Sequence, residues 1–389
     1  MPSLPPDSSD SPPPSAMPSP EALEASRPAM RPLAWRANVG LFAATVASCF
    51  LTWFVYDGTA DRARHAAQFT GSLLAILLAH EFGHYIAARV HKVDASLPYF
   101  LPLPLLSPFG TMGAVIRMRS VIPTRRALLD IGASGPLAGL ALAIPIYAWG
   151  VAHSPIVPLD GSGSVELGDS LLLRLLDHLF AGPVPDGMDI MLSPVAFAGW
   201  GGMFVTMINL LPVGQLDGGH VAFALFGPRQ NRLAQWVHRS MLAFFFVSVA
   251  SFALRDVRAG LGLWRLGRHI DNSLFWLVWF EILAVLGTFA TRADNDRVGS
   301  RTRLVSVLGL AAIAGTFRER SSPAIWAAWL LGLGILLAME VRGGTLRRAS
   351  TLLDHPPTGA QPLGPGRAAI AIATLLLFAA LFMPSPFSM

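Results

Sequence analysis

The residues best suited to chemistry in this sequence are two histidines and a glutamate in the run His80-Glu81-Phe82-Gly83-His84. On a helix, residues four apart project from one face at about 6 Å from each other, so both imidazoles can reach one metal ion. Glu81 then projects beside that metal, where its carboxylate can take a proton from a metal-bound water. The spacing therefore predicts a metal site with its own general base.

The surroundings of this motif favour a functional site over a chance match. A bare HExxH also occurs on the surface helices of soluble proteins, where it binds nothing. Here the motif lies near the end of an apolar run, residues 67–90. Two imidazoles and a carboxylate inside a membrane segment are energetically unfavourable unless they are paired or coordinated. We therefore expect His80 and His84 to bind a metal ion.

A third ligand must come from elsewhere, because a catalytic zinc site uses three protein ligands and leaves the fourth position to water. The run from Asn209 to Gly219 offers an acid within another apolar stretch. Pro212 and several glycines interrupt the helix there, and broken helices in membrane proteins line polar cavities. Asp217 lies in this interruption, so we expect its carboxylate to complete the site.

Together the two motifs resemble the site-2 protease family of intramembrane zinc metalloproteases. That family pairs HExxH on one helix with NxxPxxxLDG on a later one, and residues 80–84 and 209–218 follow both patterns in that order. The similarity covers residues 67–226 and looks strongest to the bacterial and chloroplast-type branch. It implies zinc ligands His80, His84 and Asp217, with Glu81 as general base and later as acid toward the leaving amine.

Asn209 falls at the family's Asn position, and two interpretations are open for it. The resemblance implies a catalytic role, in which the amide hydrogen-bonds a bound peptide or the developing oxyanion. Alternatively, the amide satisfies backbone carbonyls that Pro212 leaves without an N–H partner.

Neighbouring polar and small residues are interpreted as structural. The run Ser134-Gly135-Pro136-Leu137-Ala138-Gly139 has small residues four apart, which favours close helix packing, and in the resembled family a similar helix lies against the metal site. We assign His220 to the membrane interface and not to the metal. Asp130 falls within a predicted span, so it should pair with an arginine, face water or snorkel.

The composition places the chain in the membrane. Of 389 residues, 53% are hydrophobic and only 14% are charged, with a mean hydropathy of +0.51, which is too little charge to cover a soluble globule. The net charge of +5 comes mostly from arginines in connecting segments, a pattern that sets membrane orientation and gives no reason to expect nucleic acid. The single Cys49 excludes an intramolecular disulfide and a cysteine-based zinc cage.

The chain divides into a tail and a polytopic membrane domain. Residues 1–34 are rich in proline and serine and should be disordered. Residues 35–389 form the membrane domain, with 67–226 as the zinc-protease core and 227–389 as further transmembrane helices of unknown role. We predict an all-α fold with about eight or nine transmembrane helices. The candidate spans are residues 36–56, 67–90, 125–152, 193–226, 233–254, 271–291, 303–317, 322–341 and 367–383.

The connections predict orientation and a second structural feature. Arginines before residue 36 and between residues 89 and 126 make those segments cytoplasmic, whereas the acidic connection 153–192 falls outside. Within the first of these connections, residues 95–120 are too apolar for a water-exposed loop and too rich in proline for a helix. We expect a small membrane-associated β-hairpin near the active site, whose edge could pair with an extended peptide.

The sequence thus predicts an intramembrane zinc metalloendopeptidase that hydrolyses transmembrane substrate proteins, by family analogy in regulated intramembrane proteolysis. The expected partners are one Zn²⁺ per chain, a transmembrane substrate and the lipid bilayer, with no nucleic acid. The expected location is the bacterial inner membrane, with the active site near the cytoplasmic side. A non-cleaving pseudoprotease of the same fold and an ion or metal transporter are the alternatives, and a zinc protease with a later Glu as third ligand is a weaker one.

Overall fold

The structure of the protein is a computed structural model, and it describes residues 35–105, 107–158, 166–262, 269, 273–280, 283, 358–359 and 361–388. The predicted disordered tail 1–34 and the predicted spans 303–317 and 322–341 lie outside these described residues. Most of the predicted span 271–291 does so as well, although residues 273–280 are helical.

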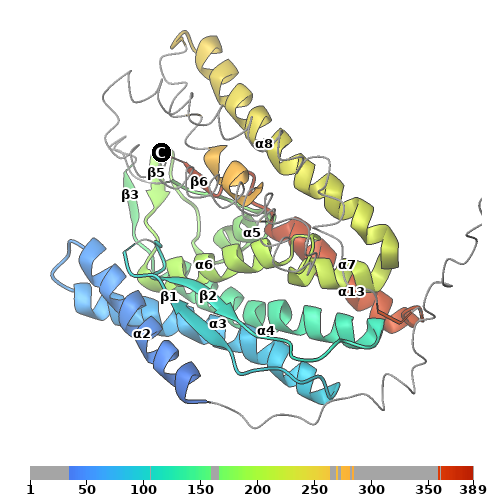
Figure 1. The fold of residues 1–389 in the computed structure, drawn as a ribbon. Coiled ribbons are helices and arrows are strands. Elements are labelled where there is room, and N and C mark those ends of the chain that lie inside the picture. The colour runs from blue at the N-terminus through green and yellow to red at the C-terminus, as the bar shows by residue number, and fades with distance from the viewer. Residues whose placement is uncertain are drawn as a thin grey trace, which may run out of the picture.

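Helices dominate the described part of the chain (Figure 1). They are α2 (Arg36–Tyr56), α3 (Arg62–Val90), α4 (Arg125–Ala152), α5 (Leu171–Phe180), α6 (Pro194–Asn209), α7 (Asp217–Phe226), the short 3-10 helix η1 (Gly227–Arg229), α8 (Gln230–Arg258) and α13 (Pro365–Leu381).

Among the described residues, four helical stretches are long and apolar enough to cross a membrane: α2, α3, α4 and the continuous stretch Asp217–Arg258. Helices α6 and α13 are shorter, with 16 and 17 residues. A mostly helical architecture with four candidate membrane-spanning helices is therefore confirmed, whereas the predicted eight or nine spans are not.

Proline, glycine and capping residues explain where the central helices begin and end. Thr124 caps α4, its side chain accepting a hydrogen bond from the backbone N–H of Ala127, and Ser193 caps α6 in the same way. The predicted span 193–226 is two helices, α6 and α7, separated by residues 210–216, and Pro212 lies in this gap as expected. Helices α2 and α4 have the predicted bounds, and α3 begins at Arg62, earlier than the predicted 67.

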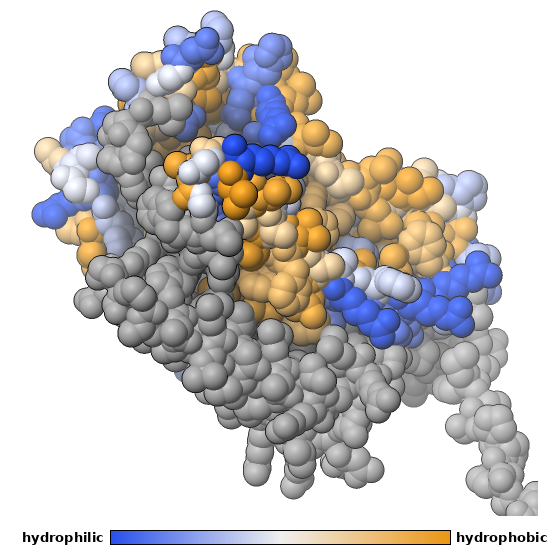
Figure 2. All heavy atoms as spheres, turned by 90° about the horizontal axis from the view of Figure 1, so that it is seen from above, coloured by the Kyte–Doolittle hydropathy of each residue, from blue (hydrophilic) through white to orange (hydrophobic). Residues whose placement is uncertain are grey.

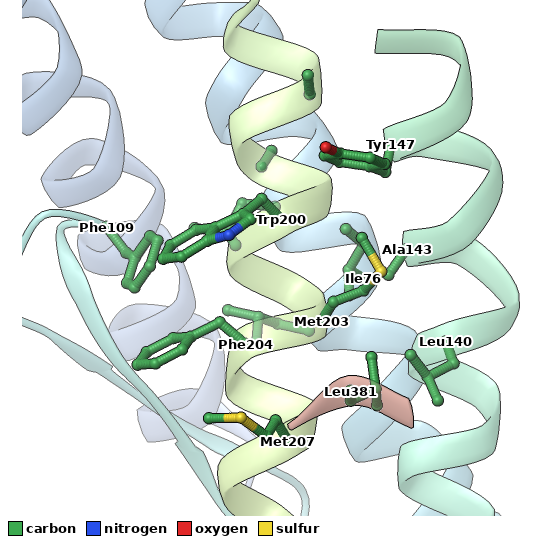
Figure 3. Close-up of a cluster of buried hydrophobic side chains, with 14 of the residues drawn as sticks. Ile76, Phe109, Leu140, Ala143, Tyr147, Trp200, Met203, Phe204, Met207 and Leu381 are labelled. Carbon is green, nitrogen blue, oxygen red and sulfur yellow. The ribbon is translucent and has the colours of Figure 1, made fainter. Parts of the chain in front are cut away.

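The core lies where α3, α4 and α6 pack together, with α6 at its centre (Figures 1 and 3). Trp200 and Met203 of α6 are fully buried, and Tyr147 of α4 and Ile76 of α3 are buried in the same hydrophobic cluster. Glycines let the helices approach: a Cβ at Gly202 would lie 2.8 Å from the side chain of Ile76. Leu381, at the end of α13, adds a side chain from far along the chain (Figure 3).

Strands are few and short, and they form three two-stranded sheets in the described part of the chain. The predicted hairpin is one of them: β1 (Tyr99–Pro102) pairs antiparallel with β2 (Thr111–Val115) and lies beside α2. The other two were not predicted. They pair β3 (Ile156–Pro158) with β5 (Met188–Ile190), and β4 (Glu166–Leu167) with β6 (Phe387–Ser388).

The surface of the described part carries many apolar side chains, as a lipid-facing protein requires. Figure 2 shows broad apolar areas with the polar residues gathered in separate patches. Exposed apolar residues occur on the outer face of α3, at Phe82, Ile86 and Val90, and along α5, at Leu171, Leu175 and Leu179. This distribution agrees with a protein whose helices contact lipid.

Candidate metal centre

Helix α3 presents its chemical residues in its last third, where it packs against α4 and α6. His80, Glu81 and His84 are all buried, with 4%, 7% and 7% of their surfaces exposed. The two histidines project from one face of the helix toward the same point, as their four-residue spacing predicts. Glu81 directly follows His80 on the same helix and is buried with both histidines.

The break between α6 and α7 delivers Asp217. Gly214 has a φ of +54°, a left-handed conformation that costs glycine little, and the chain turns there before α7 begins at Asp217. Gly218 and Gly219 pass directly against the backbone of residues 210–214, where a side chain at either position would clash. The carboxylate therefore stands in the first turn of α7, where the helix dipole favours a negative charge.

The three predicted ligands converge on one point. His84 Nε2 lies 3.2 Å from His80 Nε2 and 3.2 Å from Asp217 Oδ2, and His80 Nε2 lies 3.3 Å from the same oxygen. Ligands bound at about 2.0–2.1 Å to a tetrahedral zinc ion are about 3.3 Å apart. The spacing of these three atoms thus fits a zinc ion between them.

The hydrogen bond on the far side of His84 strengthens this fit. His84 Nδ1 donates to the backbone carbonyl oxygen of Ile131 at 2.7 Å, so in the neutral ring Nε2 carries the lone pair. That lone pair points toward the Asp217 carboxylate and the second imidazole. Lone pairs and a carboxylate facing one another at this distance repel unless a cation lies between them, and holding a ligand histidine through its other nitrogen is typical of metal sites.

Asn209 reaches the same centre from the end of α6. Its Nδ2 lies 3.2 Å from His80 Nε2. An amide at this position is within reach of a group bound next to the histidines, as the first of the two interpretations requires. In the described part of the chain, the candidate ligand cluster consists of His80, His84 and Asp217, and His220 is not in it.

Helix α4 lies against the metal site, as the resemblance to the site-2 protease family implies, and its glycines contact both histidines. A Cβ at Gly135 would overlap the His84 ring, and one at Gly139 would lie 3.2 Å from His80 Nδ1. Ser134 Oγ also donates to the carbonyl of Gly83 at 2.9 Å. The run 134–139 therefore packs as predicted, and its glycines also provide the surface on which both histidines rest. The spacing of small residues predicted the packing, and the family resemblance implied the position beside the metal site.

Comparison with known proteins agrees with this geometry. Residues 68–248 match the model of peptidase family M50, and this range contains all five predicted site residues. The chain is 38% identical over 161 residues to the probable zinc metalloprotease EGY1, chloroplastic, of Oryza sativa subsp. japonica, which is 40% of this chain and 27% of that protein. It is 37% identical over 163 residues to EGY1 of Arabidopsis thaliana, or 40% of this chain and 29% of that protein.

A third relative, the probable zinc metalloprotease EGY2, chloroplastic, of Oryza sativa subsp. indica, is 34% identical over 158 residues, or 39% of this chain and 28% of that protein. No solved structure matches the chain. The chain thus spans less than a third of the length of these relatives. Residues 68–248 thus match peptidase family M50, the site-2 protease family, and the predicted resemblance to that family is confirmed.

Proposed function

We propose that this chain is an intramembrane zinc metalloendopeptidase that hydrolyses peptide bonds of transmembrane proteins. The observation that carries the proposal is the mutual spacing of 3.2–3.3 Å between His80 Nε2, His84 Nε2 and Asp217 Oδ2. The family match and the names of the relatives support the same chemistry.

The roles of the residues follow from their positions. Zinc held by His80, His84 and Asp217 would polarise the substrate carbonyl and acidify a water molecule beside it. Glu81, adjacent and buried, takes the proton of the attacking water and delivers it to the leaving nitrogen. The amide of Asn209, 3.2 Å from His80 Nε2, donates a hydrogen bond to the oxygen on which negative charge develops.

The substrate must be extended where it is cut, because a helical peptide hides its carbonyls in its own hydrogen bonds. We infer that a transmembrane substrate unwinds near the β1–β2 hairpin and that the reaction serves regulated intramembrane proteolysis, with the active site near the cytoplasmic side. The expectation of a bacterial inner membrane gains no support from the relatives, whose names place them in chloroplasts.

Two other functions make different demands on the site. A pseudoprotease would bind membrane proteins without cleaving them, although Glu81 and all three ligands are present. A transporter needs ionisable groups arranged along a path across several spans, whereas the candidate cluster found in the described residues gathers at a single point.

The decisive experiment replaces the base and keeps the ligands. In Glu81→Gln, the amide cannot accept the proton, so cleavage of a transmembrane substrate in detergent or liposomes should fall by at least about 100-fold. Zinc content, measured by elemental analysis of the purified protein, should stay near one per chain. His84→Ala is the matched variant and should lose both zinc and cleavage. Wild-type activity in Glu81→Gln would refute the mechanism, and an inactive wild type with bound zinc would favour the pseudoprotease.

A further inference from the structure

Helix α7, which carries Asp217 in its first turn, ends in a way that leaves a backbone carbonyl without its helical partner. The carbonyl of Ala224 would normally accept a hydrogen bond from the N–H four residues later. That residue is Pro228, which has no N–H. The carbonyl of Leu225 lies in the same last turn, where helices leave such groups unpaired.

Arg125, the first residue of α4, supplies both missing donors. Its Nε donates to the carbonyl oxygen of Ala224 at 2.8 Å, and its Nη2 donates to that of Leu225 at 2.8 Å. The planar guanidinium suits two neighbouring acceptors, and a cation at a helix C-terminus is stabilised by the helix dipole. Gly227, with a φ of +61°, lies under the guanidinium: a Cβ there would be 3.6 Å from Nη2.

The other end of α7 rests on the same face of α4. A Cβ at Gly132 would lie 2.8 Å from the Cβ of His220 and 3.3 Å from the carbonyl oxygen of Asp217. Arg125 and Gly132 are two helical turns apart, so α4 holds α7 antiparallel at both of its ends. One residue before Gly132, the carbonyl of Ile131 accepts the hydrogen bond of His84. The first two turns of α4 thus contact both α7, which carries Asp217, and His84 of α3.

We propose that Arg125 is a positioning residue for the metal site, acting through α7 to fix Asp217 relative to the two histidines. The proposal rests on the proposed zinc site. Without the guanidinium, two carbonyls at the end of a ten-residue helix lose their donors, and the helix gains freedom to shift along α4. A shift of the helix moves Asp217 away from His80 Nε2 and His84 Nε2.

The test uses Co²⁺ as the probe, because its visible absorption bands report ligand geometry as well as occupancy. Purified full-length Arg125→Ala should bind Co²⁺ about tenfold more weakly in competition with a chelator, the size of effect seen for residues behind metal ligands. Its visible bands should shift in position or intensity. Arg125→Lys keeps one charged donor and should fall between Arg125→Ala and wild type. Arg126→Ala, an exposed neighbour on the same helix, is the control and should match wild type.

The outcomes separate this inference from the proposed function. Wild-type protein that binds no Co²⁺ would refute the zinc site itself. If wild type binds and both Arg125 variants keep its affinity and spectrum, Arg125 is not a positioning residue, even where thermal stability falls. If Arg125→Ala fails to fold, Arg125→Lys decides alone: an unchanged spectrum and affinity would overturn the proposal.

Discussion

His84 is held from two sides by α4. Its Nδ1 donates to the Ile131 carbonyl, and its ring lies over Gly135, where a side chain has no room. The orientation of the ring is therefore set by backbone atoms of a helix that carries none of the three ligands. A backbone carbonyl and a glycine are available for this purpose because the run 134–139 keeps α3 and α4 close.

Gly135→Ala should therefore lower zinc affinity more than the addition of a methyl group at an ordinary helix–helix contact would. The added Cβ overlaps the His84 ring, so the ring must rotate and zinc affinity should fall at least about tenfold. Gly139→Ala, with 3.2 Å to His80 Nδ1, should have a smaller effect. Gly71→Ala, where the new Cβ meets nothing within 4 Å, is the control. Zinc titration of the three purified variants measures the series, and equal affinities would contradict it.

At the scale of elements, the features that depend on residues close together in the sequence were predicted, whereas contacts between distant segments were missed. His80 and His84 are one turn apart, and Pro212 with its glycines marks the broken helix that presents Asp217, so all three could be read from short motifs. The bonds of Arg125 to α7 join residues about a hundred positions apart, and no local pattern announces them. The strand pairs β3–β5 and β4–β6 were missed for the same reason, since their partners are short and far apart in the chain.

Helix α13 is tied to the core by an ion pair of this long-range kind. Arg367 Nη2 lies 2.8 Å from Asp130 Oδ2, and Nε lies 3.0 Å from Oδ1. His91 Nε2, at the end of α3, lies 2.8 Å from the same Oδ2. Asp130 therefore pairs with an arginine, one of the outcomes expected for an acid within a span, and it joins three helices that are distant in sequence.

Removing this link should loosen α13 without emptying the metal site. Arg367→Ala should lower the thermal unfolding midpoint by a few degrees, since the bidentate pair is partly exposed and worth about 1 kcal/mol. Zinc content should stay at the wild-type value. Arg174→Ala breaks the ion pair with Asp169, which is more exposed, and should leave the midpoint unchanged. Thermal unfolding in detergent measures the midpoints of both variants. Equal shifts would contradict a specific role of the Arg367–Asp130 ion pair in holding α13.

At the scale of the whole molecule, the arrangement of charge along the chain predicts on which side of the membrane the site opens. Arginines and Lys92 gather between the end of α3 and the start of α4, and the connection after α4 is acidic. His84 lies six residues before the end of α3 at Val90, so the metal site is near the arginine-rich side. This orientation would give the proposed protease access to substrates from the cytoplasmic half of the bilayer.

Cysteine labelling tests this orientation, because the chain has a single native cysteine, Cys49, which is completely buried. In a Cys49→Ala background, new cysteines at Arg126 and at Asp186, both exposed, report the start of α4 and the connection that follows α4. A membrane-impermeant maleimide applied to intact cells should label the cysteine at 186 and reach the one at 126 only after permeabilisation. Labelling of both cysteines from outside would contradict the predicted topology. Helix α4, with 28 residues, is long enough to separate its two ends by a bilayer.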